Sequence, residues 1–183
     1  MKIAVIGWGS IIWDKGSLKT TGDWRHDGPE LPLEFCRISS PGKSKERLTL
    51  VLSEIGTKCI TYWDLMAATD LKTARNNLRD REGAVTDDIE IYLRDQNPLS
   101  RAAVHMESWL KGHPEVDAVI WTGVSSNWRL LRNKDFSKED LIQYLDSKKS
   151  SIARIKENFD KTPEQLQTMG KDVFVKWCKE QGI

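Results

Sequence analysis

Two places in this sequence carry groups that can do chemistry: a glycine-rich turn near the start and a glutamate at the end of a predicted helix. Gly7, Gly9 and Ser10 follow the largely apolar run that starts after Lys2 and covers 3–6, which has the length and β-branched composition of a buried strand. Glycines let the backbone approach a ligand and direct successive amide N–H groups toward one carboxylate or phosphate. The turn therefore predicts an anion-binding site.

Glu82 is the acid side chain that the helical pattern places near the interior. The apolar side chains of 71–78 recur every three or four residues, and continuing that face by four residues reaches Glu82, while Gly83 fits the position that ends a helix. Burial and the negative end of the helix dipole both raise the pKa of such a carboxyl group. The spacing also allows the opposite arrangement, in which Arg81 points inward and Glu82 lies in solvent.

The opening turn partly matches the dinucleotide-binding pattern G-x-G-x-x-G. Gly7 and Gly9 fit, but Ile12 stands at the third glycine position, and no helical pattern follows before Asp14 and Gly16. A nucleotide-binding α/β protein organised by this turn is therefore a weaker alternative.

Three segments, in order along the first half of the chain, resemble the γ-glutamylcyclotransferase-like family, which includes the glutathione-degrading ChaC branch. Trp8-Gly9-Ser10-Ile11 is similar to the Tyr-Gly-Ser-Leu loop of that family. Residues 35–39 and 47–51 look like its second strand pair, and residues 78–83 (Leu-Arg-Asp-Arg-Glu-Gly) look like the segment that carries its acid/base glutamate.

The resemblance implies a fold, a reaction and a site. The fold is α+β, with a small mixed or antiparallel sheet curling into a barrel flanked by helices. The reaction cyclises a γ-glutamyl amine or peptide to 5-oxoproline and releases the amine, with no cofactor and no metal. Glu82 is then the catalytic acid/base, and the substrate-binding residues are Trp8, Gly9, Ser10, Ile11 and Arg47.

The sequence departs from the family pattern at positions that matter for activity. Trp8 replaces the usual tyrosine and removes a hydroxyl group, so a non-catalytic small-carboxylate-binding module of the same fold is the alternative function. Arg47 matches a family arginine; it either pairs with a carboxylate or lies in solvent at the edge of a strand.

Composition restricts the partners. Lysine plus arginine number 28 against 27 for aspartate plus glutamate, so no nucleic acid or membrane partner is expected. The sequence shows no membrane-spanning run and no signal peptide, and its three scattered cysteines are typical of a reducing compartment. A cytoplasmic protein is therefore expected. The three histidines show no metal-ligand spacing.

The remaining pattern predicts how these groups are positioned. Strands are expected at 2–7, 33–39, 47–52, 57–63, 89–93 and 116–122, and helices begin near Thr69, Asn97, Ser137 and Thr162. We expect an α+β core at 1–130 and a helical C-terminal extension at 131–183, packed on the same domain or on a second subunit of a homodimer. The loop 15–32 is expected either to cover a ligand cleft or to be a surface loop pinned by Trp24.

Overall fold

The computed structural model describes residues 1–40, 42 and 46–183 of the chain. It is a mixed α+β protein, as predicted, with two sheets and six α-helices among the described residues. One compact unit is made of Met1–Leu31 with Ile60–Val124, and the other of Pro32–Cys59 with Ser125–Ile183. This division differs from the expected boundary between residues 130 and 131, because the strands of the segment Pro32–Cys59 group with the C-terminal helices.

The first unit is built on a four-stranded mixed sheet with the strand order β5-β1-β7-β6. The central strand β1 pairs antiparallel with β5 and parallel with β7, and β7 pairs antiparallel with β6. The bounds of the four strands are β1 Ile3–Gly7, β5 Tyr62–Leu65, β6 Ile89–Leu93 and β7 Ala118–Thr122.

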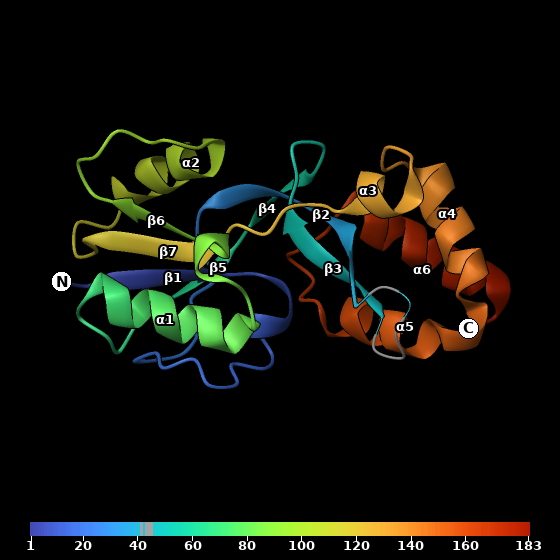
Figure 1. Cartoon of the computed structure of the whole chain (residues 1–183), viewed down its shortest axis with the longest axis horizontal. Coiled ribbons are helices and arrows are strands. Elements are labelled where there is room, and N and C mark those ends of the chain that lie inside the picture. The colour runs from blue at the N-terminus through green and yellow to red at the C-terminus, as the bar shows by residue number, and fades with distance from the viewer. Residues whose placement is uncertain (41, 43–45) are drawn as a thin grey trace. The chain divides into compact units, whose positions relative to one another are not determined.

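Two helices cover opposite faces of this sheet (Figure 1). Because side chains alternate along a strand, Ile3 and Val5 face helix α1 (Leu71–Glu82), with Ala74 and Leu78 of α1 in the same buried cluster. The other face is covered by α2 (Arg101–Leu110). Short 3₁₀ helices occur at η1 Gly9–Ile11 and η2 Thr86–Asp88.

The second unit combines a three-stranded sheet, of order β3-β2-β4, with the C-terminal helices. Its strands are β2 Glu30–Ser39, β3 Arg47–Leu52 and β4 Thr57–Ile60. Its helices are α3 Trp128–Arg132, α4 Lys138–Ser147, η3 Lys149–Ser151, α5 Ile152–Lys161 and α6 Met169–Gln181. Helix α5 packs on β3 and helix α4 packs on α6. The predicted hairpin connection between β2 and β3 lies largely outside the described residues.

The expected barrel is not formed: within the described residues the two sheets stay separate and neither closes on itself. The physical reason lies in the predicted strand 57–63, which is interrupted at Thr61. Its first part is β4 of the three-stranded sheet, and its continuation is β5, which pairs with β1. The Thr61 hydroxyl donates a 2.7 Å hydrogen bond to the Pro29 carbonyl, which fixes the chain where it changes sheets.

The long segment after the opening turn is pinned along the outer edge of β5. Arg25 exchanges backbone hydrogen bonds with Trp63. The Lys15 ammonium lies 3.1 Å from the buried carboxylate of Asp64. The ring of Trp24 lies against Gly7, so closely that a Cβ added at Gly7 would come within 2.8 Å of the ring. The segment therefore covers an edge that would otherwise expose unpaired backbone groups.

No helix in the described part of the chain combines the length and the apolar character needed to cross a membrane.

Candidate functional site

The opening turn begins where β1 ends. Trp8 has an extended backbone, and Gly9 has a φ angle of 65°, in the left-handed region that glycine adopts without strain. The chain then makes one turn of 3₁₀ helix, Gly9–Ile11, with the Ile11 side chain buried beneath it. Amide N–H groups in the first turn of a helix have no intrahelical acceptor. The first N–H groups of this turn therefore have no acceptor within the 3₁₀ helix, at the point where the central strand of the sheet ends.

Glu82 is the last residue of α1, as predicted. Asp70 caps the start of the helix by accepting a hydrogen bond from the Thr73 amide. Gly83 ends it in the left-handed conformation, with a φ angle of 60°. The side chain of Glu82 is 22% exposed, so the carboxyl group is largely buried but still reaches solvent.

Arg81 joins this carboxyl group to the opening turn. Its guanidinium Nη1 donates to Glu82 Oε1 at 2.7 Å, and Nη2 donates to the Ser10 hydroxyl at 3.3 Å and to the Asp14 carbonyl at 2.5 Å. The predicted acid and the predicted anion-binding turn therefore lie within the span of one guanidinium group.

Burial controls the protonation of Glu82. It raises the pKa of the carboxyl group above its ordinary value, and the charge and hydrogen bond of Arg81 oppose that shift without cancelling it. Desolvation disfavours the charged form of an acid, whereas a neighbouring cation favours it. The result is a carboxyl group that keeps its proton to a higher pH than an exposed glutamate does.

The helical pattern left two arrangements open, and the structure combines them. The side chain of Arg81 is only 8% exposed, and that of Glu82 is 22% exposed. Both turn away from bulk solvent, and the arginine is the more buried. From the sequence, Arg81 is expected only to compete with Glu82 for the inward position. Its spacing of three residues from Leu78 is the signal that marks it as a residue of the site.

The other predicted binding residues fall in two places. Trp8 and Ser10 are half-buried at the opening turn, and Gly9 and Ile11 are buried there. Arg47 belongs to the second unit, where it is exposed as the first residue of β3 and pairs in register with Ser39. The structure therefore brings Ser10 and Glu82 together through Arg81 within the first unit, whereas Arg47 belongs to the second unit.

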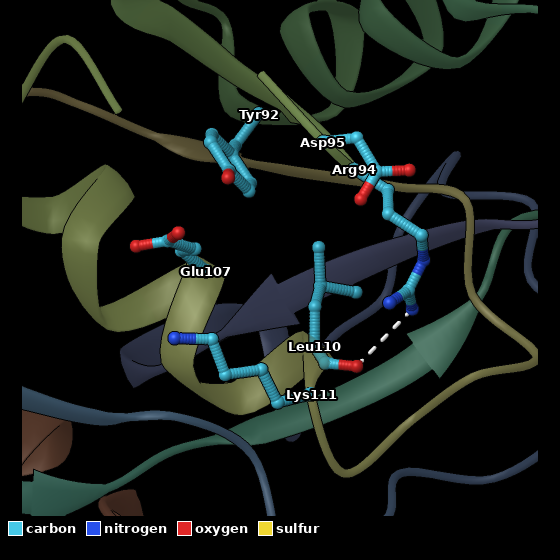
Figure 2. A pocket seen from close by; sticks show the side chains of 6 residues that line it. All are labelled: Tyr92, Arg94, Asp95, Glu107, Leu110 and Lys111. Atoms are coloured by element: carbon cyan, nitrogen blue, oxygen red, sulfur yellow. Dashed lines mark hydrogen bonds between the residues drawn. The ribbon is translucent and has the colours of Figure 1, made fainter. Parts of the chain in front are cut away.

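A separate pocket of about 90 Å³ lies in the first unit (Figure 2). The Arg94 guanidinium on its wall donates to the carbonyls of Leu110 at 3.1 Å and His113 at 2.6 Å, so this cation caps the end of α2. No motif or spacing in the sequence predicts this pocket. It is lined by Tyr92, Arg94, Asp95, Glu107, Leu110 and Lys111.

No group of three or more His, Cys, Asp or Glu side chains in the described ranges is arranged to hold a metal ion. Comparison with protein-family models, with curated proteins and with solved structures gives no match to this chain.

Proposed function

We propose that this protein is a γ-glutamylcyclotransferase-like enzyme of the corresponding α+β fold family, which converts a γ-glutamyl amine or peptide to 5-oxoproline and releases the amine. The observation that carries the proposal is the link from Ser10 through Arg81 to Glu82. It places a half-buried acid of raised pKa beside a glycine turn suited to a carboxylate. The family resemblance of the two segments supports the same roles.

The reaction needs one proton carrier and no co-reactant. The α-ammonium group of the substrate gives a proton to the Glu82 carboxylate, and the free amine attacks the γ-carbonyl carbon of the same molecule. A ring C–N bond forms and the original γ-amide C–N bond breaks. Glu82 returns this proton to the departing nitrogen. It then transfers the second proton, which the ring nitrogen loses as the lactam forms, so that the amine leaves as an ammonium ion and atoms and charges balance. A carboxyl group with a pKa raised toward the working pH serves both steps.

The substrate must be held folded for its amine to meet its own carbonyl. Backbone N–H groups of Gly9, Ser10 and Ile11 are the donors we assign to the glutamyl α-carboxylate. Fixing reacting groups in this way is worth several kcal/mol in favourable cases.

The test is incubation of the protein with a panel of γ-glutamyl peptides and amines, glutathione included, with 5-oxoproline detected by mass spectrometry. The proposal predicts product from at least one member and its loss in Glu82→Gln. The matched control is Asp80→Asn, because Asp80 is a carboxylate on the same helix whose side chain is 61% exposed. Product that forms equally with Glu82→Gln would remove Glu82 from the mechanism.

A second candidate function is a non-catalytic module that binds small carboxylates. Trp8 favours it, because this indole cannot supply the hydroxyl of the family tyrosine. Thermal stabilisation by small carboxylates, with no 5-oxoproline from any substrate of the panel, is the result that distinguishes this candidate from the enzyme.

A further inference from the structure

Arg81 is a nearly buried cation whose nearest charged group is the acid assigned to proton transfer. Its guanidinium contacts one neutral hydroxyl, that of Ser10, one carbonyl, that of Asp14, and one carboxylate oxygen, that of Glu82. A guanidinium has five N–H donors arranged in a planar fork that matches a carboxylate. The site therefore holds a group able to bind an anion directly beside the opening turn.

The contacts of this guanidinium are unequal. The bond to the Glu82 carboxylate is 2.7 Å long, whereas the bond to the Ser10 hydroxyl is 3.3 Å long and is the weaker of the two. A ligand carboxylate placed at the Ser10 side gains charge-assisted hydrogen bonds that a hydroxyl cannot match. The Ser10 hydroxyl would lose only this weaker hydrogen bond when such a ligand binds.

We propose that Arg81 binds the carboxylate of the ligand, and that this carboxylate takes over guanidinium donors now directed at Ser10 and Glu82. This deepens the proposed function and rests on it for the identity of the ligand, a compound with a carboxylate on a γ-glutamyl or 5-oxoproline skeleton. The loop amides and Arg81 then hold the carboxylate from two sides.

The exchange of partners links binding to proton transfer. While Arg81 is paired with Glu82, it favours the charged form of that acid. When the ligand carboxylate shares the guanidinium, Glu82 loses part of that support and becomes a better proton acceptor at the moment when the substrate ammonium is beside it. A ligand without a carboxylate does not produce this change.

The experiment measures binding without turnover. 5-Oxoproline and its carboxamide, 5-oxoprolinamide, are titrated by isothermal calorimetry into the wild type, Arg81→Gln, Arg81→Lys and Arg79→Gln. Arg79 is the matched control, because it lies on the same helix with its guanidinium paired to Asp80 at 2.6 Å. We expect the wild type to bind the acid and not the amide, Arg81→Gln to lose tenfold or more in affinity, Arg81→Lys to recover part of the loss, and Arg79→Gln to match the wild type.

Equal affinity of wild type and Arg81→Gln for 5-oxoproline, or wild-type binding of acid and amide alike, would overturn the proposal. A second measurement uses the wild-type protein alone. We expect the NMR resonance of the Arg81 Nε–H group to shift when 5-oxoproline is added and to stay unchanged when the amide is added. If the protein binds 5-oxoproline and the Arg81 resonance does not shift, the proposal is also overturned.

Failure of this inference and failure of the proposed function give different results. Arg81-dependent carboxylate binding without product from any γ-glutamyl compound removes the reaction and leaves the binding role intact. Product formation with an unchanged KM in Arg81→Gln removes the role of Arg81 and leaves the reaction intact.

Discussion

Two glutamates of this molecule have their pKa raised by burial, and they are held in different ways. Glu34, on β2 of the second unit, is 0% exposed. Its Oε1 accepts hydrogen bonds from the backbone N–H groups of Phe35 at 2.7 Å and Gly170 at 3.0 Å. Glu82, in the first unit, is 22% exposed and is paired with the Arg81 side chain at 2.7 Å. Burial is the largest cause of the raised pKa in both.

The difference shows what separates a structural carboxyl group from one that can react. Glu34 satisfies an amide at the start of α6, where a helix has donors without partners and favours negative charge. The donors to its Oε1 are backbone groups, the Thr168 side chain is a further hydrogen-bond partner, and the residue is 0% exposed, so a substrate does not reach it. Glu82 keeps contact with solvent, and its partner is a side chain that can change partners. A raised pKa alone does not identify the acid of a catalytic site; access and an exchangeable partner do.

The largest difference expected between Glu34 and Glu82 is the effect of their replacement on the turnover number. Replacement of Glu82 by glutamine removes the proton carrier, and we expect the turnover number to fall by about 10²–10⁴-fold, the usual contribution of general acid–base catalysis. Circular dichroism and the thermal midpoint should stay close to wild type, because the glutamine side-chain oxygen can still accept the bond from Arg81. The measurement is 5-oxoproline release under saturating substrate.

Glu34→Gln is the comparison variant for that experiment. It should retain the wild-type turnover number, since Glu34 has no part in the proposed reaction. Loss of turnover in folded Glu34→Gln protein, or normal turnover in Glu82→Gln, would reverse the roles assigned to the two acids.

The second largest effect is expected when the close packing of Glu34 against helix α6 is disturbed, and it is an effect on the free energy of unfolding. An alanine Cβ at position 170 would lie 2.5 Å from Glu34 Oε1 and 3.3 Å from Phe35 Cβ. We expect Gly170→Ala to lower the free energy of unfolding by about 1–3 kcal/mol, the usual range for overpacking. Urea denaturation measures it. The direction of the change in stability is informative, because replacing glycine by alanine within a helix normally stabilises a protein. A Gly170→Ala variant more stable than the wild type would contradict the close packing of Glu34 on α6.

The third effect is the pH dependence of stability. The pKa of Glu34 is raised in the folded protein, so the folded state binds a proton over a pH range in which the unfolded state has lost it. The advantage of wild type over Glu34→Gln should therefore be greatest below the ordinary glutamate pKa and should fall as the pH rises through the folded pKa. Urea denaturation of both proteins across this range gives the difference. A difference that grows with pH would mean that the carboxylate form is the one stabilised.

The smallest effect is at the residue that follows Glu82. Gly83 has a φ angle of 60°, and an added Cβ would meet no atom within 4 Å. Gly83→Ala therefore introduces backbone strain without a clash, and we expect a loss of about 1 kcal/mol in the free energy of unfolding. Thermal denaturation gives the value. A loss as large as that of Gly170→Ala would show that position 83 is crowded as well.

Local signals in the sequence predicted much of the fold. The stripe of Ala74 and Leu78 on α1 and the helix end at Gly83 are confirmed, because both depend on residues within one or two turns. The cap at Ser137 is confirmed for the same reason. The start near Asn97 was wrong, since Ser100 supplies the cap of α2.

Features set by distant parts of the chain were not predictable. The C-terminal helix starts after Thr168 and not near Thr162; both threonines fit a cap, and Glu34, far away in the sequence, occupies the start of the helix. The division of the predicted strand 57–63 between two sheets depends on pairing with β1 and β2. Residue types and spacing carry no information on such pairings.

The candidate site was predictable in part. The turn at Gly9 and the position of Glu82 follow from strand and helix patterns. The role of Arg81 required the three-dimensional course of the chain after the turn, because its guanidinium is held by the Asp14 carbonyl as well as by the Ser10 hydroxyl.

The most direct measurement is the pH titration of the Glu82 carboxyl carbon by ¹³C NMR in protein labelled at glutamate Cδ. The resonance is assigned by its absence in Glu82→Gln. We predict a pKa above the ordinary value, because burial outweighs the opposing charge of Arg81, and a further rise when 5-oxoproline is added. A Glu82 carboxyl group that titrates at or below the ordinary value, with or without 5-oxoproline, would contradict its assignment as the proton carrier.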